Sequence, residues 1–149
     1  MAINRLLFSI DIRAAKDKIW KALWDENSYR DWAGVFFEGS YAITDSWKEG
    51  STVLFLAPDQ SGIYSNIEKH IPNTTMWFTH IGTVLHGKEQ PIDDEAKKWS
   101  GATEVYTLTE GSGYNTLTIE IDVLDEHRDF MTNTFPKALE VTKRLSEDE

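Results

Sequence analysis

Cysteine is absent from the 149-residue chain, which excludes a disulfide framework, a thiolate metal site and a cysteine nucleophile. The four histidines show neither HxxxH nor HxH spacing, so the sequence predicts no histidine-built zinc site, and we expect no metal and no cofactor. No apolar run approaches the roughly 18 residues that a membrane-spanning helix needs. Residues 1–13 also lack the order of a signal peptide. We therefore expect no membrane insertion and a cytoplasmic protein.

Positive charge is scarce. Fifteen Lys and Arg residues stand against 25 Asp and Glu residues, which gives a net charge of −10. Such a chain repels phosphate backbones and anionic lipid surfaces unless a local basic patch overrides the mean. The densest basic cluster, Lys143-Arg144, is followed at once by the acidic residues 146–149. The sequence therefore predicts no nucleic-acid partner.

Aromatic residues are abundant: six Trp, five Tyr and seven Phe make up 12% of the chain. Side chains of this size can either overfill a small core or line a cavity, and composition alone leaves both readings open. The length fits one domain over 1–149, at about 150 residues per domain, and we expect residues 146–149 to form a frayed acidic tail.

Hydrophobic periodicity predicts the order of the elements. Alternation over 3–13 predicts a half-buried strand, and an apolar stripe over 14–24 predicts an amphipathic helix. Asn27-Ser28 predicts the start of a second short helix that ends before Gly34. The turns that follow separate six expected strands at 36–45, 51–57, 63–70, 75–86, 102–109 and 116–124.

Two further segments complete the expected architecture. The long acidic segment 87–101 predicts a flap with a helical turn at 94–98. Residues 125–146 return to helical periodicity, and Pro136 should kink or split this helix. The predicted fold class is α+β: a curved antiparallel sheet of about six to seven strands wrapped around a long C-terminal helix, with two short helices after the first strand.

Several of these segments carry a family resemblance. They are the helix Ala14–Trp24, Gly50, Gly62-Ile63, Met76-Trp77-Phe78, Thr103–Tyr106, Thr116-Leu117-Thr118 and Lys137-Ala138-Leu139. The chain resembles the START-like, or SRPBCC, superfamily with the helix-grip fold, and within it the group related to the C-terminal domain of the activator of heat shock protein 90 ATPase. The resemblance implies a deep apolar cavity between the sheet and the last helix, suited to lipids, hormones or polyketide-like molecules. Some members of the superfamily are enzymes, so the fold does not decide the activity.

The chain departs from that group in two ways. It begins at the expected first strand, so we expect no counterpart of the separate N-terminal domain of the chaperone activator. Its flap is also longer and more acidic than usual, which would alter the entrance to the cavity.

Two polar residues on inward strand faces are the candidate anchors of a site. The hairpin around Gly111, with Thr109 opposite Thr116, places Glu104 on the same inward face as Tyr106. Glu104 is then a ligand contact or a general base, or else a strand-end carboxylate that leans into solvent or pairs with a lysine. His80 shares its strand face with apolar side chains, and it either orients a ligand or relays a proton, or is a satisfied core histidine.

The candidate wall of the cavity consists of apolar side chains. Met131 and Phe135 lie one turn apart on the last helix, and either line the cavity or pack in the core. Trp32 either closes one end of the cavity or holds the short helix in place. The full set of predicted ligand-binding residues is Trp32, Phe78, His80, Glu104, Tyr106, Met131 and Phe135.

Three functions follow, from different classes. The first is binding of a hydrophobic or amphipathic small molecule, such as a lipid. The second is a cyclase- or hydrolase-type enzyme in the same cavity, with His80 and Glu104 in proton transfer. The third is a protein-interaction module that regulates a chaperone. No nucleophile stands beside a base in the sequence, so no catalytic residue is assigned, and the ligand and the oligomeric state stay open.

Overall fold

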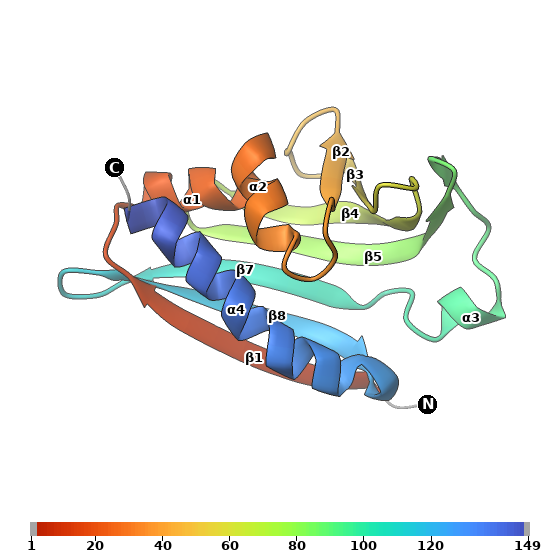
Figure 1. Cartoon of the computed structure of the whole chain (residues 1–149). Helices are drawn as coiled ribbons and strands as arrows, with labels where there is room; N and C mark the ends of the chain where they lie inside the picture. Colours follow the sequence, from red (N-terminus) through yellow and green to blue (C-terminus); the bar gives the residue numbers. More distant parts are fainter. Residues whose placement is uncertain (1–2, 148–149) are drawn as a thin grey trace.

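The computed structural model describes residues 3–147, which form one curved antiparallel sheet with the main helices packed on its concave face (Figure 1). The strands are β1 (Ile3–Ile12), β2 (Tyr41–Thr44), β3 (Thr52–Leu56), β4 (Gly62–Ile71), β5 (Thr75–Leu85), β6 (Lys88–Glu89), β7 (Thr103–Glu110) and β8 (Asn115–Leu124). The helices are α1 (Lys16–Trp24), α2 (Glu26–Ala33), α3 (Asp94–Lys97), the 3-10 turn η1 (Asp125–His127) and α4 (Arg128–Glu147).

The strand order across the sheet is β1-β8-β7-β5-β4-β3-β2, and β6 pairs with the end of β5. The sheet therefore has eight strands, one more than the upper estimate from the sequence, because the flap contributes the two-residue β6. Thr109 lies opposite Thr116 in the β7–β8 hairpin, as the sequence predicts. This register turns Tyr106, Ile119 and Ile121 toward the concave side, where all three are buried.

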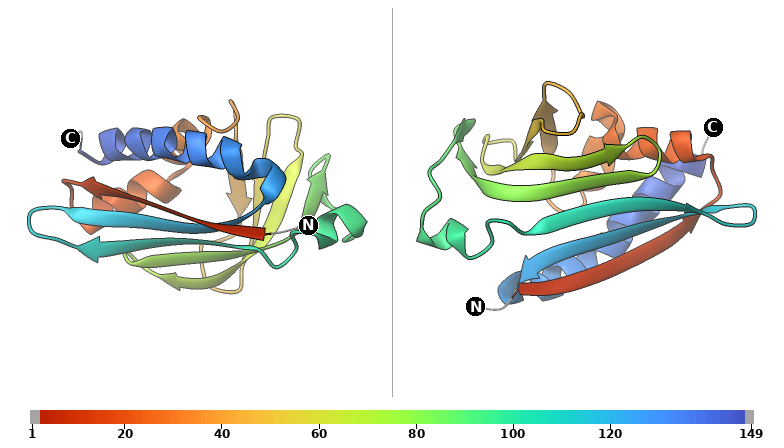
Figure 2. Two further views of the ribbon diagram at one scale, coloured as in Figure 1. Left: turned by 90° about the horizontal axis from the view of Figure 1, so that it is seen from below. Right: turned by 180° about the vertical axis from the view of Figure 1, so that it is seen from behind.

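Helix α4 crosses the concave face, and α1 and α2 lie beside it in the same layer (Figure 2). The predicted α+β architecture, a sheet wrapped around a long C-terminal helix with two short helices after β1, is confirmed. Pro136 lies inside α4 and does not split it. Pro136 and Thr132, whose carbonyl loses a helical partner to the proline, are both exposed, so solvent can satisfy that carbonyl.

Three local predictions need correction. Residues 36–40 form turns rather than the start of a strand, with Ser40 N–H donating to the Phe37 carbonyl at 3.1 Å. Helix α2 begins before the predicted cap, and Ser28 lies inside it, where its hydroxyl donates to the Lys21 carbonyl at 3.0 Å. Ser146 and Glu147 continue α4 instead of fraying, and Ser146 is fully buried. Residues 148–149 of the predicted tail lie outside the described residues.

The flap has the expected helical turn. Asp93 caps α3, because its side chain accepts a hydrogen bond from the Ala96 N–H at 2.8 Å. The flap rejoins the sheet beside His80, whose N–H donates to the Ala102 carbonyl at 2.8 Å, while Gly101 N–H donates to the His80 carbonyl at 2.8 Å. The end of the flap is therefore fixed to the strand that carries one of the candidate anchors. Among residues 3–147, no helix has both the length and the apolar character that crossing a membrane requires.

Candidate functional site

A cavity of about 540 Å³ lies between the concave face of the sheet and the helices. Its walls come from α1, α2, β3, β4, β5, β7, β8 and α4, and exposed Phe37 and His127 lie at its rim. All seven predicted site residues line it: Trp32, Phe78, His80, Glu104, Tyr106, Met131 and Phe135.

Aromatic rings form much of the wall and also pack against one another. Trp24 lies at the centre, with ring centroids 4.9 Å from Tyr106 and 5.4 Å from Phe78. Phe135 on α4 stacks on Phe8 of β1 at 4.9 Å. The aromatic residues therefore serve both purposes that composition left open, because the rings fill a core and also line the cavity between them.

Trp24 and Trp32 differ in how their indole N–H groups are satisfied. Trp32 Nε1 donates to the Leu23 carbonyl at 3.0 Å, so this residue both lines the cavity and ties α2 to α1. Trp24 Nε1 is buried and has no partner among the described residues. Leaving a buried donor unpaired costs about 1–3 kcal/mol. Trp24 lines the main cavity and also a smaller hollow of about 340 Å³ beside α1.

A chain of polar side chains runs from the sheet to the cavity wall. Ser65 Oγ lies 2.6 Å from His80 Nδ1, and His80 Nε2 lies 3.2 Å from Glu104 Oε1. The second carboxylate oxygen of Glu104 accepts a hydrogen bond from the Tyr106 hydroxyl. A neutral His80 with its proton on Nε2 satisfies both ring contacts, since it accepts from Ser65 and donates to Glu104.

Strand pairing explains how these four polar side chains come together. β4, β5 and β7 are neighbours in the sheet, Ser65 lies opposite His80, and Phe78 lies opposite Glu104. A register shift between Tyr64 and Ser65 accompanies the approach of Ser65 to His80.

Burial and the nearby carboxylate act together on two tyrosines. Burial, reinforced by the charge of Glu104, raises the pKa of Tyr106 well above its usual range. The same two causes raise the pKa of Tyr29. Tyr106 therefore keeps its proton and remains a donor to Glu104. Ser65 is fully buried and does not line the cavity, so it positions the His80 ring and is not placed to attack a ligand.

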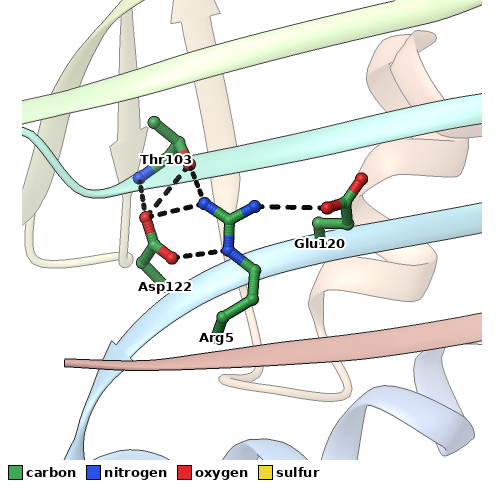
Figure 3. Close-up of polar contacts among 4 residues, drawn as sticks. All are labelled: Arg5, Thr103, Glu120 and Asp122. Carbon is green, nitrogen blue, oxygen red and sulfur yellow. Dashed lines mark hydrogen bonds and ion pairs between the residues drawn. The ribbon is translucent and has the colours of Figure 1, made fainter.

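The outer face of the sheet carries a separate polar cluster (Figure 3). Arg5 Nε lies 2.8 Å from Asp122 Oδ1, and its Nη1 lies 3.2 Å from Glu120 Oε1. Asp122 also accepts from the N–H and the hydroxyl of Thr103, both at 3.0 Å. Burial by itself would raise the pKa of Asp122, but the hydrogen bonds from Arg5 and Thr103 outweigh it and hold the pKa below its usual value.

The structure shows the contacts of the two predicted anchors. Glu104 neither leans into solvent nor pairs with a lysine; its partners are His80 and Tyr106. His80 lies at the cavity with both ring nitrogens in contact, as a satisfied histidine does.

The sequence analysis did not predict Ser65 as a site residue, although the alternation of β4 places this polar side chain on an inward face. Ser65 stands between Ile63 and Ile67, on an inward strand face that is otherwise apolar. The same criterion selected Glu104. Within residues 3–147, no three His, Asp or Glu side chains come together in a group that could hold a metal ion.

Comparison with solved structures identifies the fold. The solution structure of the Aha1 dimer from Colwellia psychrerythraea matches 97% of this chain and 96% of its own, with a TM-score of 0.69 and 20% identity. This chain has the helix-grip fold. The crystal structure of protein MLL2253 from Mesorhizobium loti matches 95% of this chain and 96% of its own, with a TM-score of 0.70 and 15% identity.

A third helix-grip structure is a longer protein. DynU16, from the dynemicin biosynthetic locus, matches over 94% of this chain but only 46% of its own, with a TM-score of 0.64 and 12% identity. No protein-family model matches the chain, and no curated protein matches its sequence. At these identities the likeness shows the fold alone, and an argument for function must come from the cavity.

Proposed function

We propose that this helix-grip domain, expected to act as a single cytoplasmic unit, binds a hydrophobic or amphipathic small molecule in its cavity. The observation that carries the proposal is the cavity itself, about 540 Å³ with aromatic walls and a few convergent polar groups. Ligand pockets in proteins occupy about 300–1,000 Å³ and have this kind of lining. Burial of the ligand's apolar surface would supply about 25 cal/mol per Å².

A fluorescent probe tests this proposal. N-phenyl-1-naphthylamine, which is uncharged at neutral pH and brightens in apolar surroundings, should bind saturably to the wild-type protein. Met131→Trp should weaken that binding, because Met131 lines the cavity and a larger ring there takes up ligand space. The matched control is Phe130→Trp, on the next residue of α4, which is half exposed and does not line the cavity.

The outcomes separate binding from general apolar adsorption. Saturable binding that Met131→Trp weakens and Phe130→Trp leaves intact supports the proposal. A charged residue at Phe135, as in Phe135→Asp, should abolish binding if circular dichroism shows the variant folded. Absence of saturable binding, or equal binding by wild type and both α4 variants, contradicts the proposal.

The contact between His80 and Glu104 favours a second candidate, an enzyme of the cyclase or hydrolase kind. A histidine and a carboxylate at 3.2 Å beside a cavity can exchange a proton with a bound substrate. On a substrate found by ligand screening, His80→Gln and Glu104→Gln should lower turnover and change its pH dependence. Unchanged turnover in both variants would remove this candidate.

The third candidate, regulation of a chaperone, draws on the likeness to the Aha1 dimer. That likeness concerns the fold, and no surface formed by residues 3–147 adds an observation specific to a chaperone. Pull-down with the purified chain, compared with the ligand titration, separates a protein partner from a small molecule.

A further inference from the structure

The cavity has a one-sided electrostatic character. None of the described residues that line it is a lysine or an arginine. Its titratable side chains are Tyr29, His80, Glu104, Tyr106, Asp122 and His127. The Asp122 carboxylate is held on the outer face by Arg5 and Thr103 (Figure 3). Glu104 is therefore the charged group that a ligand would meet inside.

The donors that contact Glu104 are already engaged. Both nitrogens of His80 have partners, and the Tyr106 hydroxyl donates to Glu104. Of the polar groups left on the wall, the Trp24 N–H and the Tyr29 hydroxyl are neutral. At the rim, the Glu126 carboxylate lies 3.8 Å from exposed His127. An anion that enters the cavity would find no charged partner to replace water.

Glu104, in contrast, retains capacity to accept. An ionised carboxylate has about four lone-pair sites, and the contacts with His80 and Tyr106 use two of them. Its side chain is 19% exposed in a cavity that it lines. Aromatic rings, Trp32 and Phe78 among them, line the same cavity, and the face of such a ring favours a cation over an anion.

We propose that the cavity selects amphiphiles whose polar group is a neutral or positively charged hydrogen-bond donor and discriminates against carboxylates, with Glu104 as the specificity-determining residue. The inference rests on the proposed binding function. A ligand hydroxyl or ammonium donates to Glu104, whereas a ligand carboxylate meets a like charge in an apolar site without a counterion. The net charge of −10 acts in the same direction at longer range.

Three ligands that share one alkyl chain test the selection. Dodecylamine, dodecanol and dodecanoate, each below its aggregation concentration, compete with N-phenyl-1-naphthylamine for the wild-type protein at neutral pH. Dodecylamine should displace the probe at a concentration at least about tenfold lower than dodecanoate does, with dodecanol between them. This ranking needs no variant, so it tests the proposal even where a substitution disturbs folding.

Glu104→Gln keeps the size and an acceptor oxygen of the side chain and removes its charge. In this variant the ratio between the displacing concentrations of dodecanoate and dodecylamine should shrink to roughly threefold or less, mainly because dodecanoate binds more tightly. The matched control is Glu120→Gln on the neighbouring strand β8, whose side chain binds Arg5 on the outer face (Figure 3). Glu120→Gln should keep the wild-type ranking.

The outcomes distinguish this inference from the proposed function. If the wild-type protein binds the probe and dodecanoate displaces it as readily as dodecylamine does, the proposed selection is wrong, but the binding function is still supported. If Glu104→Gln and Glu120→Gln change the ranking of the three ligands equally, Glu104 is not the residue that determines specificity. If neither the probe nor any of the three alkyl ligands binds, the binding function and the inference fall together.

Discussion

His80 Nε2 and Glu104 Oε1 lie 3.2 Å apart at the cavity wall, on neighbouring strands β5 and β7 and 24 residues apart in the chain. Ser65 holds the other ring nitrogen of His80 from β4, on the far side of β5. The pair is therefore supported from three adjacent strands and shielded by aromatic rings. This arrangement fixes one carboxylate, with free acceptor capacity, in an otherwise mainly apolar cavity.

Ser65→Ala should destabilise the fold by about 1–3 kcal/mol, because it leaves His80 Nδ1 without its buried partner. Urea unfolding measures the free energy, and nitrogen chemical shifts of the His80 ring report a change in its proton position. Ser9→Ala on the exposed face of β1 is the control and should stay within about 0.5 kcal/mol. Equal stabilities of the two variants, with unchanged His80 shifts, would show that Ser65 does not position the ring.

Tyr106→Phe should lower the free energy of unfolding at neutral pH by about 1.5–3 kcal/mol, since Glu104 loses a buried donor. The folded-state pKa of Tyr106 is raised above its ordinary value of 10.0, so the stabilisation is present below about pH 10 and is lost as pH rises further. The wild-type free energy of unfolding should therefore fall more steeply between about pH 9 and about pH 11 than that of Tyr106→Phe. Parallel pH profiles would contradict the raised pKa.

Asp122→Asn should cost about 1 kcal/mol at pH 7, because Asp122 accepts from both Arg5 and the Thr103 backbone and hydroxyl (Figure 3). The folded-state pKa of Asp122 is lowered, so its contribution is present above its unfolded pKa of about 3.9 and is lost as pH falls through the folded value. The difference between wild type and variant, measured by urea unfolding, should shrink below about pH 4. Glu120→Gln, which removes a charged partner of Arg5 at a side chain that is 45% exposed, should cost less than about 0.5 kcal/mol.

Pro136→Ala should stabilise the protein by about 1–2 kcal/mol. Pro136 lies inside α4 at an exposed position, so alanine restores a backbone N–H to the helix without changing the core, and a small gain in unfolded-chain entropy offsets part of the benefit. The thermal midpoint and urea unfolding measure the change. Lys137→Ala, at the next exposed position, is the control, and a Pro136→Ala variant no more stable than this control would refute the prediction.

Local sequence patterns were enough to predict much of the fold. Alternation assigned Glu104 and Tyr106 to the inward face, and the turn at Gly111 predicted the register of the last hairpin. The helical stripe around Trp24 predicted α1, and the flap sequence predicted the turn capped by Asp93. These predictions succeed because a strand repeats every two residues and a helix every 3.6, so a short stretch of sequence contains the information.

Other features required the packed molecule. Alternation placed His80 and Glu104 on inward faces but could not show that they meet, because a face does not say which strands are neighbours. Their contact depends on β7 pairing with β5 after the flap has left and rejoined the sheet. The same argument explains why a lysine partner was considered for Glu104 and why the contact of Ser65 with His80 could not be predicted.

The sequence by itself determined the α+β class, the order of the main elements, the inward faces of the candidate strand residues and the acidic, cysteine-free character of the chain. Only the tertiary structure decided that the aromatic rings leave a cavity, that Glu104 is held by His80 and Tyr106, and that no lysine or arginine reaches the cavity wall among the described residues. The physical reason is one of range. Periodicity and turn chemistry act over a few residues, whereas cavity volume and the pairing of buried polar groups are set by contacts between distant segments that meet only when the sheet and helices pack.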